Sequence, residues 1–365
     1  FTVWFTEYNV GIMNLKSFSF LPKACLGVDV GTSYLKVVEI SRWGDRKRLK
    51  NYGELHASAL YNKPFRTFDK NALLLSNRDI ARAVRAIVEE ADIKTKKAVF
   101  SLPDFSSFFT NFMLPPMSKR ELPNAVEYES RKHVPLPFSE VALDWQVVDG
   151  VFNEKKPSRI LIVAVPNEIM AQYQEIARLA KLELAGMEAE VFGLIRSSLG
   201  DDEGVTVILD IGSQSTTVSL VYKGVLRTSR SLDVAGNSFT ERIAQSLSIS
   251  REQAEQLKAE KGIEFSADNA KILSPLIDLI LLEVQRVSEQ FLQIEKKGIE
   301  KILIGGGTAI LPGLQTYIGQ NLQVETEIIN PFRSVFYTPI LEKRMKEMGP
   351  SYAVSVGAAL RGLAS

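Results

Sequence analysis

A strand, a tight turn and a second strand occur twice in this chain, about 180 residues apart. The first copy reads LGVDV, GTS, YLKVVEI from Leu26, and the second reads VTVILDI, GSQ, STTVSLVYKG from Val205. Because β-branched residues fill the strands and each turn carries a glycine, each copy predicts a β-hairpin. The 365 residues exceed what one compact core usually holds. The repeat therefore predicts an α/β protein with two lobes of related construction.

Charge and cysteine content exclude several functional classes. Forty-four Lys and Arg residues against 43 Asp and Glu leave a net charge of +1, far from the basic excess that binding to nucleic acid needs. Cys25 is the single cysteine, which excludes an intramolecular disulfide and favours a reducing compartment. His133 is one of two histidines, so a multi-histidine metal site is excluded. The longest apolar runs are too short to cross a bilayer. We therefore expect a cytoplasmic protein.

The first 24 residues form a separate leader that we expect to be disordered. Aromatic residues are scattered through residues 1–12 without a period, and a short basic and aromatic stretch runs from Met13 to Lys23. The leader lacks the apolar core and cleavage site of a secretory signal. Met13 is predicted to be the initiator, so that residues 1–12 are not native. An aromatic tether to a membrane or a partner is the alternative.

The predicted elements divide the remaining chain into two lobes, and the first lobe carries an insertion. In the insertion the pattern changes to strand, strand, helix, a proline-rich turn, two more strands and a helix. The predicted boundaries are 25–96, about 185–203 and 345–365 for the first lobe core, 97–184 for the inserted subdomain, 204–249 and 299–344 for the second lobe core, and 250–298 for a helical subdomain of the second lobe.

Both repeated hairpins place an Asp at the end of an apolar strand, just before a turn of glycine and hydroxyl residues. Backbone amides in such turns can point at phosphate oxygens, because glycine permits close approach. Asp29 and Asp210 would face a cation between them, and Mg²⁺ is commonly held by one or two carboxylates plus phosphates. Lys36 can contact a phosphate as a point charge. The predicted phosphate contacts are Gly31, Thr32 and Ser33 in the first turn and Gly212, Ser213, Gln214 and Ser215 in the second.

One Asp-x-Gly turn is weak evidence, because such turns often do no more than reverse the chain. Two of them at the heads of repeated sheets are much stronger. A third glycine-rich element follows another apolar strand, where the backbone can lie flat against a nucleoside. A flexible turn is the alternative interpretation of this element. Its residues are Gly305, Gly306, Gly307 and Thr308.

The order of these elements resembles the superfamily of actin, the heat-shock chaperones and the sugar kinases, over nearly the whole chain from Cys25 onward. The resemblance implies an actin-like (ribonuclease H-like) two-lobed fold that binds ATP with Mg²⁺ in the cleft between its lobes. It also includes a terminal helix of small residues, Tyr352 to Leu363.

Further site residues follow from this resemblance. It implies that Glu255 and Lys258 reach the ribose and base, although an ordinary solvated helical pair has the same spacing. Gly236 resembles a glycine near the terminal phosphate, and Ala235 departs from the second glycine that the family often has there. Glu190, at the start of AEVFGLIRSSL, is the candidate catalytic residue, because related ATPases orient the attacking water from this helix. A simple partner for the helix dipole is the alternative role. Whether ATP is hydrolysed stays open.

The inserted subdomain narrows the resemblance to the PilM family of type IV pilus assembly, which is related to FtsA. The stretch VEYESRKHVPLPFSEVALDWQVV carries this likeness. It implies an ATP-binding adaptor of the inner-membrane assembly platform, peripheral to that membrane through its partners, that binds the N-terminal cytoplasmic tail of a PilN-like membrane protein. Other pilus or secretion components and self-association remain open as further contacts.

Two alternatives remain from the sequence. An FtsA-like filament-forming ATPase of cell division is expected to carry a C-terminal amphipathic helix, and 361–365 shows none. A small-molecule kinase needs a base and a substrate pocket, for which the first lobe has no distinctive candidate. For the adaptor, a groove between the inserted subdomain and the first lobe is expected to take the tail. Its predicted lining is Tyr128, Arg131, Lys132, Val134, Leu136 and Phe138.

Overall fold

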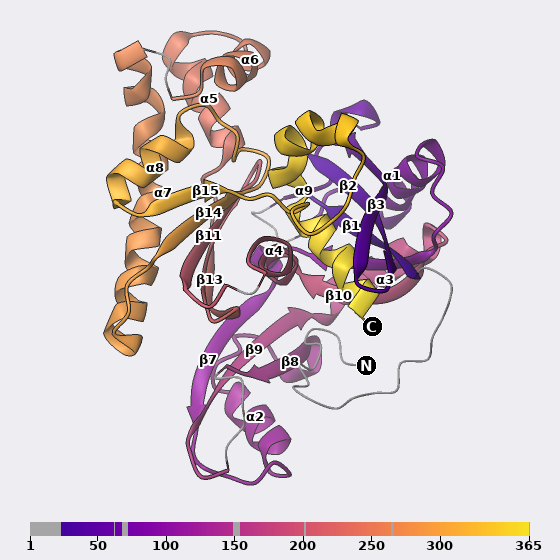
Figure 1. Cartoon of the computed structure of the whole chain (residues 1–365), viewed down its shortest axis with the longest axis vertical. Coiled ribbons are helices and arrows are strands. Elements are labelled where there is room, and N and C mark those ends of the chain that lie inside the picture. Colours follow the sequence, from indigo (N-terminus) through magenta and orange to yellow (C-terminus); the bar gives the residue numbers. More distant parts are fainter. Residues whose placement is uncertain are drawn as a thin grey trace.

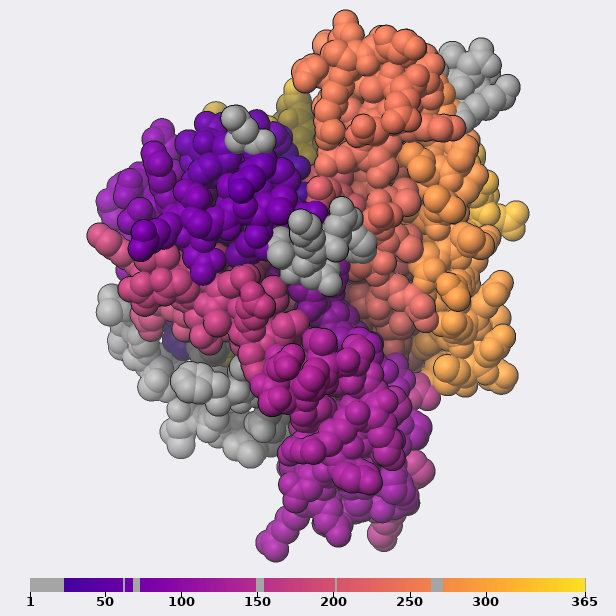
Figure 2. Space-filling view, turned by 180° about the vertical axis from the view of Figure 1, so that it is seen from behind, coloured from indigo at the N-terminus to yellow at the C-terminus, as the bar shows by residue number. Residues whose placement is uncertain are grey.

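The computed structural model describes residues 23–61, 63–67, 72–148, 154–200, 202–263 and 266–364. Two five-stranded sheets form two lobes, and a smaller three-stranded sheet projects from their junction (Figure 1). Seen from behind, the inserted subdomain forms one end of the molecule (Figure 2). The predicted leader lies outside the described residues, except for its last two.

The first lobe is built on the sheet β3-β2-β1-β6-β10. Strands β1 to β3 are antiparallel, whereas β6 and β10 run parallel to β1 and to each other. The helix Asn77–Glu90 buries one apolar face, and Ser76 caps it by accepting a hydrogen bond from the Asp79 amide. The strands are β1 (Lys23–Val30), β2 (Tyr34–Trp43), β3 (Arg46–His56), β6 (Lys97–Leu102) and β10 (Glu183–Ala189). The flanking helices are α1 (Asn77–Glu90), α3 (Asn167–Leu179) and α9 (Glu342–Ala364), with a short pair β4 (Arg66–Thr67) and β5 (Ala72–Leu73).

The second lobe repeats this topology strand for strand. Its sheet has the order β13-β12-β11-β14-β15, again with three antiparallel strands followed by two parallel ones. The repeat seen in the sequence is therefore a repeat of a whole sheet. The strands are β11 (Val205–Ile211), β12 (Thr216–Tyr222), β13 (Val225–Leu232), β14 (Lys301–Gly305) and β15 (Glu325–Ile328). The helices are α5 (Gly236–Leu247), α6 (Arg251–Lys261), α7 (Ser266–Glu295) and α8 (Leu314–Leu322).

One helix, α4 (Glu190–Ser198), lies between the two sheets (Figure 1). Its buried residues Val191 and Leu194 belong to a core that also contains Ile208 and Leu303 of the second sheet. Apolar burial of this kind contributes roughly 25 cal/mol per Å². The two lobes are thus joined through a continuous hydrophobic core around α4.

The inserted subdomain is smaller than the predicted range 97–184. Strand β6 pairs with β1 and β10, and α3 packs against α1, so both belong to the first lobe. The error arose because β6 leads directly into the insertion and α3 leads out of it. Between them lie the antiparallel sheet β7-β9-β8 and one helix around their own hydrophobic core. These elements are β7 (Phe108–Leu114), α2 (Leu122–Ser130), β8 (Val141–Val147) and β9 (Ser158–Pro166).

The C-terminal helix is longer than predicted. The sequence indicated a helix from Tyr352, whereas α9 begins at Glu342 and continues through Pro350. Proline usually interrupts a helix, which is why the sequence pattern placed the start after it. Among the described residues, no helix is both long and apolar enough to cross a membrane.

Helices α4 and α9 cross at two glycines. A Cβ atom added to Gly357 would lie 1.9 Å from the carbonyl oxygen of Gly193, and one added to Gly193 would lie 2.9 Å from the carbonyl oxygen of Val354. Neither distance is compatible with the native crossing, so the glycines allow the two backbones to touch.

We predict that Gly357→Ala lowers the free energy of unfolding by about 2 kcal/mol or more, because the added methyl group forces α4 and α9 apart. The measurement is a urea titration. Gly298→Ala is the matched control, because nothing lies within 4 Å of its added Cβ. A Gly357→Ala variant as stable as the control would contradict this packing.

Candidate functional site

The first repeated hairpin brings Asp29 and Lys36 to the end of the first sheet. The two residues are paired across β1 and β2, and both are largely buried. The Ser101 hydroxyl donates to Oδ1 of Asp29 over 3.0 Å. In the turn, the Gly31 amide donates to the carbonyl of Tyr34, and a Cβ on Gly31 would lie 2.7 Å from that oxygen. The turn therefore requires glycine at this position.

The second hairpin has the same construction. Asp210 is near the end of β11, and the Gly212 amide donates to the carbonyl of Ser215 over 3.0 Å. Ser213 and Gln214 lie in the turn between these residues and stay partly exposed. The structure thus places the two predicted phosphate turns at equivalent ends of the two sheets.

Two further carboxylates join Asp29 and Asp210 at the junction of the lobes. Asp210 interacts electrostatically with both Asp29 and Glu190, and Asp104 interacts with Glu190 and Asp210. The cations facing this cluster are Arg66 and Lys36. We call these six residues, Asp29, Lys36, Arg66, Asp104, Glu190 and Asp210, the interlobe site.

Glu190 lies at the first position of α4, and both of its carboxylate oxygens have partners. Oε1 accepts a hydrogen bond from Nη2 of Arg66 at 2.5 Å, and Oε2 accepts one from the Asp104 amide at 3.2 Å. Arg66 and Glu190 are both buried, so this ion pair is shielded from solvent. The Arg66 guanidinium also lies 5.1 Å from the centre of the Phe105 ring. In this arrangement Glu190 is buried, and each of its carboxylate oxygens accepts a hydrogen bond from the protein.

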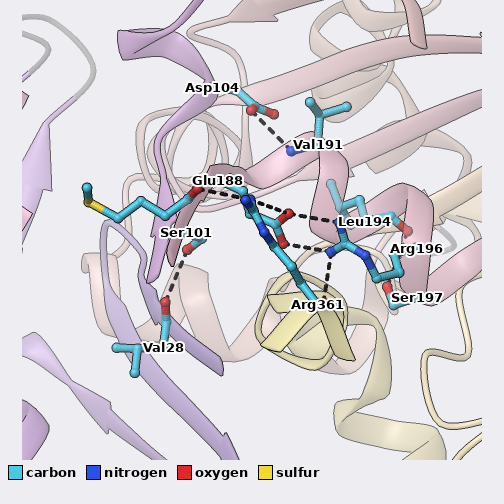
Figure 3. Close-up of polar contacts among 11 residues, drawn as sticks. Val28, Ser101, Asp104, Glu188, Val191, Leu194, Arg196, Ser197 and Arg361 are labelled. Carbon is cyan, nitrogen blue, oxygen red and sulfur yellow. Dashed lines mark hydrogen bonds and ion pairs between the residues drawn. The ribbon is translucent and has the colours of Figure 1, made fainter. Parts of the chain in front are cut away.

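Sequence reasoning missed Asp104 and Arg66. Oδ1 of Asp104 accepts a hydrogen bond from the Val191 amide at 3.1 Å and so caps the start of α4 from a distant segment (Figure 3). The other oxygen, Oδ2, is buried and has no hydrogen-bond partner. Neither residue belongs to a repeated motif, and Asp104 lies 86 positions from Glu190 in the sequence. A Pro-Asp pair at a strand end was the sole local signal.

The interlobe site has four acidic and two basic residues. Burial and the repulsion among the acidic residues raise the pKa values of three of them. Burial raises the pKa of Asp210 to about 7; the Glu190 and Asp29 carboxylates add to the shift, and Lys36 and Arg66 oppose it. Burial together with Glu190 raises the pKa of Asp104 well above its usual range. Burial also raises the pKa of Glu190, although Arg66 works against it.

The acidic residues do not form a metal site by themselves. Within the described part of the chain, no three His, Cys, Asp or Glu side chains are placed to hold a metal ion. A cation between Asp29 and Asp210 would therefore need other ligands. Phosphate oxygens and water are the usual additional ligands of Mg²⁺, so these two residues suit a cation that arrives with a phosphate.

The glycine-rich element after β14 packs directly against the second phosphate turn. The Thr308 hydroxyl and the Gly236 amide both donate to the carbonyl of Gly212, over 3.0 and 3.1 Å. A Cβ on Gly236 would lie 2.6 Å from the Thr308 hydroxyl oxygen. Three predicted residues from separate motifs therefore meet at one point.

Glu255 and Lys258 on α6 reach the same place. Nζ of Lys258 donates to the Gly236 carbonyl at 3.1 Å and to Oε2 of Glu255 at 2.8 Å. Burial disfavours the charged form of Glu255, but hydrogen bonds from Lys258 and Thr240 outweigh it and lower the pKa. The side chain of Glu255 is 57% exposed, whereas that of Lys258 is 11% exposed. Lys258 thus positions Glu255 at the surface beside the glycine-rich element.

The three glycines after Ile304 differ in their surroundings. Gly306 has φ +86°, and a Cβ there would lie 2.4 Å from the Ile211 carbonyl oxygen. A Cβ on Gly305 would lie 2.9 Å from Ile329. Gly307 has no atom within 4 Å of its Cβ position. Gly305 and Gly306 are needed for the protein's own packing, and Gly307 faces open space.

A buried ion network fixes α4 and α9 beside this site. Glu188 is fully buried and accepts hydrogen bonds from Arg196 over 2.7 and 2.9 Å and from Arg361 over 3.2 Å (Figure 3). Arg361 also donates to the carbonyl of Met187. Because the two arginines come from α4 and α9, the network holds both helices to β10. It orients the start of α4, where Glu190 lies.

The six residues predicted to bind a partner tail lie on the inserted subdomain but not on one open surface. Val134 is buried and belongs to the subdomain core. Arg131 pairs with Glu127, and Lys132 pairs with Glu129. Tyr128 and Leu136 are exposed, and Phe138 is partly buried beside the Arg131 guanidinium.

A cavity of about 530 Å³ lies elsewhere, between the inserted subdomain and the second lobe. Strands β7 and β13 border it, and each is the edge strand of its sheet. The Asn111 side chain donates to the Arg227 carbonyl over 2.8 Å and so connects the two edges. None of the six predicted residues lines this cavity. Its lining residues are Asp104, Phe105, Ser107, Phe108, Phe109, Thr110, Asn111, Leu161, Arg227, Thr228, Ser229, Arg230 and Ser231.

A family model described as type IV pilus assembly protein PilM matches residues 27–363. The chain belongs to the PilM family. Among solved structures, it is similar to one described as a PilM-PilN type IV pilus biogenesis complex, with a TM-score of 0.80 and 25% sequence identity over 93% of this chain and 98% of that one. The ethanolamine utilization protein EutJ from Carboxydothermus hydrogenoformans is 16% identical, with a TM-score of 0.58, over 93% of this chain and 90% of that one; it supports the fold alone.

These matches confirm the predicted actin-like α/β fold and the predicted membership of the PilM family. The chain is a PilM-like protein of type IV pilus assembly. The family match covers both lobes and the inserted subdomain, so it decides against the cell-division and small-molecule kinase alternatives.

We predict that Asp210→Asn makes the nucleotide-free protein more stable at pH 8. Asp210 holds its proton more tightly when folded than when unfolded, so its charge lowers stability as the pH rises from about 4 to about 7. The substitution should add roughly 2 kcal/mol at pH 8 and flatten the dependence between pH 5 and 8. Urea titrations across this range test it, with Asp45→Asn at an exposed turn as control. An unchanged slope would show that Asp210 is not in this charged environment.

Proposed function

We propose that this PilM-family chain is a cytoplasmic adaptor that binds ATP with Mg²⁺ between its lobes and holds the N-terminal tail of a PilN-like membrane protein. The observation that carries the nucleotide part is the charge imbalance of the interlobe site. Among the residues that the structure describes, four carboxylates interact there with two cations, Arg66 and Lys36. A divalent cation relieves this repulsion, and the phosphate turns supply the groups that hold the phosphates.

Each part of the nucleotide has a matching group in the structure. The turns at Gly31 and Gly212 would hold the phosphates from the two lobes. Asp29 and Asp210 would hold Mg²⁺, which supplies charge neutralisation when bound. The open side of Gly307 would admit the nucleoside, with the exposed Glu255 placed for the ribose by Lys258. Because the two phosphate turns belong to different lobes, neither lobe is sufficient by itself.

Slow turnover is part of this proposal. A residue that orients a water molecule must be reached by that water, and Glu190 is buried with its charge already paired to Arg66 and its second oxygen bonded to the Asp104 amide. The ion pair with Arg66 lowers the basicity of Glu190, so we expect it to activate water poorly while that pair is intact. ATP therefore serves mainly to fix the relation of the lobes, which is what an adaptor requires.

The tail-binding part rests on the similarity to a PilM-PilN complex across nearly the whole chain and on the cavity between β7 and β13. An extended peptide can pair with an unpaired strand edge, and its side chains can enter the space beside it. Phe108, Phe109 and Leu161 offer apolar contacts for such side chains. The predicted surface around α2 is the alternative location, although its basic residues already have acidic partners.

Asp104 connects the two proposed sites. It lines the cavity, caps α4 and contacts Glu190 through its amide. Its unpartnered Oδ2 is enclosed by the protein, so a tail would reach it once the neighbouring side chains move. A tail in the cavity and a nucleotide in the interlobe site would therefore act on the same end of α4.

For nucleotide binding, we predict that Asp29→Asn and Asp210→Asn weaken the affinity for ATP with Mg²⁺ by about tenfold or more, since each removes a metal ligand. Gly307→Val should block the nucleoside while leaving the fold intact, because its side chain enters open space. Gly298→Val is the control for the added side chain. Isothermal titration calorimetry with Mg²⁺ and with a chelator measures the effect. Unchanged affinity in all three variants would overturn the assignment.

For tail binding, we predict that Thr110→Trp fills the cavity and lowers the affinity for a synthetic tail peptide of the PilN-like protein at least about tenfold. Thr338→Trp, at an exposed position, is the matched control. Fluorescence anisotropy of a labelled peptide gives the affinity. If Phe138→Ala or Lys132→Glu loses affinity for the peptide while Thr110→Trp binds it normally, the tail site is the α2 surface. Normal binding in all of these variants would contradict a tail site on this subdomain.

A further inference from the structure

One end of the first sheet is unusually basic. The range 42–50 contains five basic residues and one acidic residue, Asp45. They surround the turn that joins β2 to β3, at the end where β1 begins. We call this surface the basic rim, and its residues are Lys23, Arg42, Arg46, Lys47 and Arg48.

On one face of the sheet, three strands place like charges directly opposite each other. Lys23 pairs with Arg42 across β1 and β2, and Arg42 pairs with Lys47 across β2 and β3. Directly opposite residues share a face with Cβ atoms about 5 Å apart, and like charges at this spacing destabilise a sheet. Such an arrangement costs stability in the free protein and becomes favourable beside an anionic surface.

The opposite face of the same rim combines basic and large apolar side chains. Trp43 pairs with Arg46, so both project from this face, and Arg48 follows two residues later on the same side. Phe336 forms a bridge with Arg48, and its ring lies 6.0 Å from the Arg48 guanidinium. Trp43 is 69% exposed and Phe336 is 62% exposed. Neither ring is buried in a hydrophobic core, so core packing does not explain why these residues are aromatic.

The rim is held rigidly in place. Gly44 has φ +59°, which suits the tight turn between the strands. The backbone of Phe336 donates to the Lys47 carbonyl and accepts from the Leu49 amide, both over 2.9 Å. Leu49 is buried against the core around α9. The exposed rings are therefore presented by a fixed scaffold, and little ordering is needed when they bind.

We propose that the basic rim, with Trp43 and Phe336, docks on the surface of a bilayer that contains anionic lipids. Tryptophan and phenylalanine enter the boundary between headgroups and acyl chains, and the long basic side chains beside them reach lipid phosphates. Each Lys or Arg near an anionic surface adds to binding. This contact is independent of the nucleotide and of the tail, and it adds a direct lipid contact to the connection made through membrane partners.

The test uses the full chain and vesicles of phosphatidylcholine with and without phosphatidylglycerol. We expect co-sedimentation with the anionic vesicles that weakens as salt rises. Arg46→Glu with Arg48→Glu should lower the partition coefficient about tenfold or more, and Trp43→Ala several-fold. Arg251→Glu with Lys261→Glu on α6 is the matched control, with the same change of charge at exposed positions. In a Trp4→Phe, Trp145→Phe background, the emission of Trp43 should shift to the blue on binding.

Three outcomes would overturn the proposal. The parent chain could fail to sediment with anionic vesicles, or the rim variants could sediment as well as the α6 control. The rim variants could also keep normal vesicle binding and lose the detergent-solubilised PilN-like protein, in which case the rim is a protein interface. Circular dichroism and urea titration of each variant separate these results from a loss of fold.

Discussion

Four carboxylates share one site at the junction of the two lobes, and the two cations beside them do not balance their charge. Desolvation makes each of these charges more costly than it would be in water, and the repulsion among them adds to that cost. The raised pKa values of Asp104, Glu190 and Asp210 all have this origin. A fold that keeps such a cluster gains stability from whatever neutralises it. A ligand that neutralises these carboxylates therefore also stabilises the junction of the two lobes.

Helix α4 connects the interlobe site to the rest of the molecule. Its first turn carries Glu190 and is capped by Asp104, its middle packs in the core between the sheets, and Arg196 near its end is bound to Glu188. The crossing with α9 allows no side chain at Gly357, so α4 has little freedom to tilt separately. Changes at its N-terminus should reach the segment from Asp104 to β7, which leads into the inserted subdomain. Nucleotide and partner then act on one rigid element.

The sequence was sufficient for the features that depend on local pattern. The two hairpins, their Asp residues and the glycine-rich element follow from strand periodicity and turn chemistry, and the repeat indicated their equivalence. Asp104 and Arg66 could not be found this way, because their roles depend on contacts with Glu190 across more than 80 positions. The boundaries of the insertion were misplaced for a related reason, since strand pairing decides to which sheet β6 belongs. The burial of Val134 in the subdomain core was also not visible in the sequence, because it lies next to a proline-rich turn without periodicity.

Proton release on nucleotide binding tests the central claim most directly. A carboxylate must lose its proton to hold a metal ion, and Asp210, with a pKa raised to about 7, keeps its proton in part of the molecules at neutral pH. Calorimetric titration of ATP with Mg²⁺ at pH 7, in buffers of different ionisation enthalpy, counts the protons exchanged. The account predicts a net release of protons on binding, and a smaller release in Asp210→Asn. Tight binding with no proton released, or with protons taken up, would contradict the placement of the cation between Asp29 and Asp210.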